Sequence, residues 1–188
     1  MFIASDYKGE NMDINMVTDF PYDGKVTLGI TPKTKEEKAL RIRIPKWQTS
    51  DVTVYINGKE EAVGKAGSYV EIKRTWQEGD KVSFEFDLSP RLIKYTGHDQ
   101  PKDNTDRYAM LCGPMMMALT GVQKEEVLPL RNRLTIEPTI PRIKMSPEEL
   151  LKNLKEDAPM HFSVDRFIFV PYYAIDKEYF TCYPIIEE

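Results

Sequence analysis

Apolar and polar residues alternate along several short segments in the first half of the chain. The sharpest alternation spans residues 40–44, where Leu40 and two isoleucines fall on one face and Arg41 and Arg43 fall on the other. This two-residue period is typical of strands with one buried face. The same pattern recurs over residues 25–30, 52–56, 68–73 and 81–86. The segments therefore predict an antiparallel β-protein rather than a helical one.

Turn residues separate these segments. Asn57-Gly58 indicates a tight hairpin, because both central positions of such a turn need positive φ, and Gly79-Asp80 marks a second turn. Short strands spaced by about ten residues are typical of an antiparallel β-sandwich or barrel. We predict one such module over residues 1–96, a polar junction at 97–104 and a second sandwich-like module over 105–188.

One helix interrupts the second module. Ser146 is a suitable N-cap, Pro147 fits the first turn, and Glu149 lies three residues after the serine. This arrangement is a capping box with proline at the first helical position. A leucine stripe follows, and Pro159 lies beyond it. We predict a helix near 147–156 in an otherwise all-β fold of two antiparallel sandwich-like modules.

Composition narrows the function. The 188 residues include 26 basic and 30 acidic side chains, with a net charge of −4. No clustered basic surface suited to nucleic acid is expected, and no apolar stretch reaches the roughly 20 residues that span a membrane. The first residues lack the basic and apolar regions of a secretory signal. The compartment stays open, because the protein is either intracellular or begins before Met1.

Few residues suggest chemistry. Cys112 and Cys182 are too few for a four-cysteine zinc site or a disulfide framework, and we expect them to be buried as small hydrophobic residues. His98 and His161 have no serine or cysteine motif beside them. The many carboxylates lie in expected turns, and no glycine-rich phosphate loop is present. We therefore expect no catalytic residue, no metal site and no cofactor.

Aromatic residues offer the best candidates for ligand contact. Flat rings stack on sugars, so Trp47 and Tyr22 are candidate substrate-binding residues if the chain binds carbohydrate. The alternative is that Trp47 and Trp76 pack in the core or at strand ends, where large aromatic rings bury much surface. We favour this second interpretation for both tryptophans.

An ordered series of motifs resembles the C-terminal β-sandwich region of glycoside hydrolase family 127, which includes β-L-arabinofuranosidases. The strongest are Leu-Arg-Ile-Arg-Ile-Pro-Lys-Trp at 40–47 and Val-Tyr-Ile-Asn-Gly at 54–58. The others are at 18–24, 67–72, 74–76, 79–80, 107–114 and, more loosely, 170–175. Each motif is a strand or turn of a sandwich, and their order along the chain makes the resemblance specific.

The resemblance implies that the catalytic residues lie elsewhere. In that family an N-terminal (α/α)₆ barrel carries a cysteine nucleophile, a glutamate and a zinc ion held by cysteines and glutamate. Cys112 and Cys182 lie outside the family's cysteine motif and take no such role. The parent family is a glycoside hydrolase of carbohydrate metabolism. The chain itself is expected to be a non-catalytic accessory region, inactive alone, as a C-terminal fragment or a separate gene product. Its implied partner is the barrel of the same or a neighbouring polypeptide.

Two other functions stay open. A free-standing carbohydrate-binding module would need an exposed aromatic platform, such as Trp47 with Tyr22. An independent hydrolase would need two facing carboxylates, for example from the loop at 95–105. If the chain instead docks on a catalytic barrel, it should also expose an apolar docking face.

Overall fold

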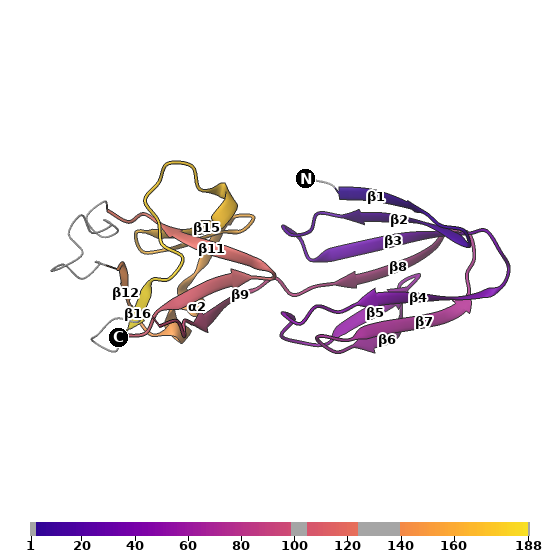
Figure 1. Cartoon of the computed structure of the whole chain (residues 1–188), viewed down its shortest axis with the longest axis horizontal. Coiled ribbons are helices and arrows are strands. Elements are labelled where there is room, and N and C mark those ends of the chain that lie inside the picture. The colour runs from indigo at the N-terminus through magenta and orange to yellow at the C-terminus, as the bar shows by residue number, and fades with distance from the viewer. Residues whose placement is uncertain (1–2, 99–104, 124–139, 188) are drawn as a thin grey trace. The chain divides into compact units, whose positions relative to one another are not determined.

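The computed structural model describes residues 3–98, 105–123 and 140–187. The chain divides into two compact units, Met1–Leu88 and Ser89–Glu188, and each is built mainly of antiparallel strands (Figure 1). The all-β prediction with a single short α-helix is therefore confirmed for the described residues. None of the helices there has the length and apolarity that crossing a membrane requires.

The first unit contains one large and one small sheet. The large sheet has six strands in the order β1-β2-β3-β8-β5-β6, and the small sheet pairs β4 with β7. The bounds are β1 Ile3–Lys8, β2 Met12–Thr18, β3 Lys25–Pro32, β4 Glu37–Arg43, β5 Val52–Ile56, β6 Lys59–Gly64, β7 Tyr69–Thr75 and β8 Asp80–Glu85. Apolar residues from both sheets form one core cluster. The small sheet has too few strands to match the width of the large one.

The alternation along β4 determines which side chains enter this core. Leu40 and Ile42 are buried, whereas Arg41 and Arg43 are exposed. Trp76 follows β7 and is only 3% exposed, and its indole Nε1 donates a hydrogen bond to the Lys38 carbonyl at 3.0 Å. The prediction that Trp76 packs in the core is confirmed.

The Asn57-Gly58 turn joins β5 to β6. Both residues have positive φ, 51° and 81°, as the sequence predicts. The Asn57 side chain also reaches the buried Asp80, to which it donates a 2.8 Å hydrogen bond. Burial raises the pKa of Asp80, but the Gln77 amide at 2.9 Å, the Asn57 amide and the charge of Arg74 together hold it below its ordinary value. The turn is thus tied to the start of β8.

A buried glutamine closes the end of the same unit. Gln48 is 6% exposed and follows β4. Its Nε2 donates to the Asp87 carbonyl at 3.1 Å, and its Oε1 accepts from the Asp87 amide at 3.0 Å. This paired contact, hereafter the Gln48 clamp, fixes the chain just after β8.

The second unit is organised around another six-stranded sheet. Its order is β13-β14-β15-β11-β10-β9, and a parallel pair, β12 with β16, forms a separate two-stranded sheet that is joined to the start of β10 by a bridge between Arg107 and Ile185. The bounds are β9 Pro90–Lys94, β10 Tyr108–Cys112, β11 Met115–Thr120, β12 Arg142–Lys144, α2 Pro147–Asn153, β13 Lys155–Ala158, β14 His161–Val164, β15 Phe167–Pro171, the 3₁₀ turn η1 Tyr172–Ala174 and β16 Ile185–Glu187. Leu150 of α2 is fully buried.

The boundary between the modules and the end of the helix both differ from the predicted positions. Strand β9 lies within 1–96, yet it pairs with β10 of the second unit, so the compact units divide at Leu88. The capping box of α2 is present, but the helix ends at Asn153 rather than near 156. There the chain turns into β13, which pairs with β14. Most of the predicted junction at 97–104 lies outside the described residues.

Candidate functional site

Of the two candidate sugar-stacking residues, Trp47 belongs to an aromatic cluster of the first unit and Tyr22 lies near a member of that cluster in the sequence. Trp47 is partly buried, stacks on Phe20 with ring centroids 6.2 Å apart, and meets Phe86 edge-on at 5.6 Å. Tyr22 is 38% exposed and lies two residues after Phe20, where its amide donates to the Asp19 carbonyl. The Trp47 ring therefore packs against protein, and Tyr22 offers the more accessible ring of the two.

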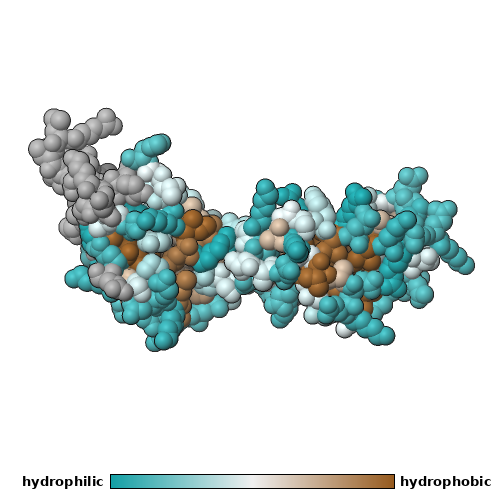
Figure 2. Space-filling view, turned by 90° about the horizontal axis from the view of Figure 1, so that it is seen from below, coloured by the Kyte–Doolittle hydropathy of each residue, from teal (hydrophilic) through white to brown (hydrophobic). Residues whose placement is uncertain are grey.

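An apolar groove of about 320 Å³ opens beside this cluster. It lies between the inner face of β2, β3 and β8 and the edge of β4. Its lining comprises Met16, Thr18, Phe20, Val26, Leu28, Leu40, Arg41, Ile42, Arg43, Phe84 and Phe86. The groove exists because β4 and β7 cover only part of the six-stranded sheet. Apolar side chains reach the surface of this unit among hydrophilic ones (right half of Figure 2).

Polar chemistry is scarce in this apolar groove. The Thr18 hydroxyl donates to the Lys25 carbonyl at 2.7 Å and accepts from the Phe20 amide at 3.0 Å, so it is already used. Arg41 Nε donates to Glu71 Oε2 at 2.5 Å. Arg43 is exposed and has no ion-pair partner among the described residues. The groove is thus suited to apolar side chains with a cationic rim. Sequence reasoning missed it, because alternation shows which face is buried but not how wide the covering sheet is.

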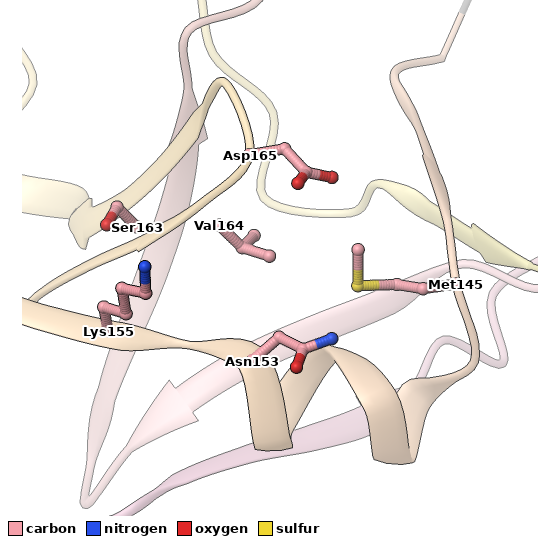
Figure 3. A pocket seen from close by; sticks show the side chains of 6 residues that line it. All are labelled: Met145, Asn153, Lys155, Ser163, Val164 and Asp165. Carbon is pink, nitrogen blue, oxygen red and sulfur yellow. The ribbon is translucent and has the colours of Figure 1, made fainter.

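A second, polar pocket of about 400 Å³ lies in the other unit (Figure 3). Asn153 ends α2, Lys155 begins β13, and Ser163 on β14 pairs with Lys155 in the strand register. Asp165 follows β14 with a φ of 50°, and Met145 and Val164 complete the lining. The lining holds one carboxylate, whereas glycosidic bond cleavage needs two facing acids. The pocket can donate and accept hydrogen bonds, but it is not a paired-acid site.

The cysteines are in environments that suppress thiolate chemistry. Cys112 is fully buried, and this burial raises the pKa of its thiol to about 12. Burial also raises the pKa of Cys182. Since the thiolate is the nucleophile and the metal ligand, neither cysteine is activated. The described residues contain no group of three His, Cys, Asp or Glu side chains that could hold a metal ion.

Within the part of the chain that the structure describes, neither histidine forms a hydrogen bond with Cys112 or Cys182. His161 Nδ1 lies 2.9 Å from the Pro159 carbonyl oxygen, and His98 is exposed beyond β9. The alternative site with paired carboxylates in the loop at 95–105 falls largely on residues 99–104, outside the described part of the chain.

Comparisons with known proteins agree with the fold. Residues 1–88 match the family described as "Beta-L-arabinofuranosidase, GH127 middle domain". Similar solved structures include a glycoside hydrolase (19% identity, TM-score 0.61), a GH127 β-L-arabinofuranosidase from Geobacillus stearothermophilus T6 (24%, 0.60) and another GH127 β-arabinofuranosidase (17%, 0.62). They cover 100%, 98% and 100% of this chain, respectively.

The chain spans about a third of those proteins, namely 34%, 32% and 35% of their lengths. No match was found among curated proteins. The family match covers the whole first unit, which is where most of the quoted motifs lie. The resemblance to glycoside hydrolase family 127 is thus confirmed, since residues 1–88 match the GH127 middle-domain family.

Proposed function

We propose that this chain is the β-sandwich region of a GH127-type glycoside hydrolase and performs no bond cleavage itself. Its role is to support a catalytic domain on the same or a neighbouring polypeptide. The observation that carries the proposal is the family match over residues 1–88, together with superposition of the whole chain on about a third of GH127 enzymes. Because fold alone does not establish function, the chemistry of the side chains must also be compatible with a non-catalytic role.

The chemistry of the described side chains supports a non-catalytic role. The resemblance implies a cysteine nucleophile in the catalytic part, and nucleophilic cysteines need a lowered pKa or a neighbouring base. Cys112 has the opposite property, since burial raises its pKa to about 12. At neutral pH such a thiol is about 10⁻⁵ ionised, a fraction that follows from the five-unit gap between pH and pKa.

Turnover by the isolated chain is the direct test. We expect no release of the aryl group when purified 188-residue protein is incubated with an aryl β-L-arabinofuranoside and zinc. A full-length GH127 arabinofuranosidase assayed in parallel shows that the substrate and the metal are competent. Zinc-dependent turnover that is lost in Cys112→Ser or Cys182→Ser would overturn the proposal. A reading of the surrounding genome adds a second test, because a barrel should be encoded upstream in frame or by a neighbouring gene.

Carbohydrate binding is the competing proposal, and Tyr22 is the residue that favours it, because its ring is 38% exposed. Isothermal titration with arabino-oligosaccharides measures this binding directly. Heat of binding that disappears in Tyr22→Ala, with an unchanged unfolding midpoint, would support it. Trp47→Ala is less informative, since it also removes the contacts with Phe20 and Phe86.

A further inference from the structure

One edge of β4 is open. The Ile44 amide donates to the Ser68 carbonyl at 2.9 Å, and the Gly67 amide donates to the Ile44 carbonyl at 3.0 Å. Backbone groups alternate in direction along an antiparallel strand, so those of Ala39, Arg41 and Arg43 point away from β7. No strand pairs with β4 on that side among the described residues. We name these backbone groups the β4 open edge.

The β4 open edge borders the apolar groove. The groove floor includes Met16 of β2 and Leu28 of β3, and β4 forms one wall. A strand added to an edge lies about 4.8 Å from its neighbour, and facing sheets lie about 10 Å apart. A third strand beside β4 would therefore lie over the groove and direct every second side chain into it.

We propose that the β4 open edge binds one extended segment of a protein partner, which adds to the β4–β7 sheet as a third strand. Main-chain hydrogen bonds supply affinity in this type of recognition, and alternate side chains supply specificity. The inward side chains are apolar, to match the lining of the groove. The inference goes beyond the proposed function, because it holds whether or not the partner is catalytic.

Charge defines the outward side chains of the segment. Arg41 and Arg43 point to the outer face of β4, and Arg43 has no ion-pair partner among the described residues. Residues opposite each other on neighbouring strands have Cβ atoms about 4.5–5.5 Å apart and favour opposite charges. Arg41 already pairs with Glu71, so the outward position opposite Arg43 is the one that we expect to be acidic, with apolar side chains at the inward positions on either side of it.

Two other occupants fit less well. Two-fold pairing of β4 with β4 of a second copy would bring the other copy's six-stranded sheet into the layer that β2 and β3 occupy here. A sugar needs hydrogen bonds from its site, but the Thr18 hydroxyl is engaged and the floor is apolar.

Amide hydrogen exchange tests the proposal in the full chain. The probe is a capped seven-residue peptide that alternates glutamate with valine or leucine, and a peptide of the same composition in block order is the control. At ten times the dissociation constant, we expect exchange of the Ala39, Arg41 and Arg43 amides to slow about tenfold. The Leu40 and Ile42 amides face β7 and should not change.

Two pairs of variants separate the edge from the groove. Arg41→Pro removes an open-edge N–H without removing a bond to β7, whereas Arg41→Ala keeps that N–H, so only the proline variant should lose binding. Met16→Lys places a charge in the groove, and Val17→Lys places it on the opposite face, where Val17 is 41% exposed. The Met16 and Val17 pair keeps the test valid if the proline variant does not fold.

Several outcomes would overturn the proposal. These are the absence of peptide binding, equal affinity in Met16→Lys and Val17→Lys, or protection at amides other than those of the open edge. Concentration-dependent protection of the open edge without peptide would assign it to a second copy. Protection by an arabino-oligosaccharide but not by the peptide would assign the groove to a sugar.

Discussion

Replacing Gln48 by methionine isolates the Gln48 clamp at nearly constant side-chain length. Gln48→Met removes both hydrogen bonds to Asp87, at 3.1 and 3.0 Å, and leaves a partly buried amide and carbonyl without them. A typical intramolecular hydrogen bond contributes about 0.5–1.5 kcal/mol net. The two bonds therefore predict that the first unit loses about 1–3 kcal/mol of unfolding free energy.

Urea denaturation followed by tryptophan fluorescence measures this loss selectively. The chain has two tryptophans, and both Trp47 and Trp76 lie in the first unit. Small proteins lose about 1–3 kcal/mol of unfolding free energy per molar urea. With the slope of a small unit near the lower end, about 1 kcal/mol per molar, the urea midpoint should fall by about 1–3 M. Gln77→Met is the matched control, since the Gln77 side chain is exposed. Equal midpoints for the two variants would refute a stabilising role for the clamp.

Three further predictions concern acid stability, backbone packing and thiol reactivity. The folded-state pKa of Asp80 is lowered, so its contribution is present above the unfolded pKa of about 4 and lost as pH falls through the folded value. Asp80→Asn should flatten the dependence of the urea midpoint below about pH 4. Gly64→Ala should lower the unfolding free energy of the first unit by about 1–3 kcal/mol, because the new Cβ would lie 2.4 Å from a methyl group of Val70. Gly29→Ala is the control and should not destabilise the unit, because its Cβ would meet no atom closer than 3.8 Å. When the protein is treated with a thiol-disulfide reagent at pH 8, the partly exposed Cys182 should react first. Cys112 should stay unmodified until urea unfolds the second unit. Fast modification of Cys112 in the native protein would contradict its burial.

Local sequence signals predicted the elements well where the physical cause is local. The alternation along β4, the positive φ values of Asn57 and Gly58, and the capping box of Ser146 all depend on residues within a few positions of one another. These features require no knowledge of the rest of the chain. The ordered motifs likewise pointed to the family that residues 1–88 match.

The candidate site could be predicted only in part. Trp47 and Tyr22 were selected because aromatic rings stack on sugars, but the sequence could not show that Trp47 packs against Phe20 and Phe86. Those two partners lie 27 and 39 positions away along the printed sequence, counted as 47 − 20 and 86 − 47. Contacts between residues so far apart in the sequence depend on the order of the strands in the sheet. The local pattern of apolar and polar residues does not contain that order.

The sequence by itself determined three things: which side chains are buried in β3, β4, β5, β7 and β8, where the tight turn lies, and how the helix begins. Only the tertiary structure decided that β9 joins the second unit, that Gln48 meets Asp87, and that two strands cover a six-stranded sheet. The physical reason is that a two-residue period specifies the buried face of a strand but not its neighbours. The apolar groove and the β4 open edge follow from strand order, and so they became visible only in the folded chain.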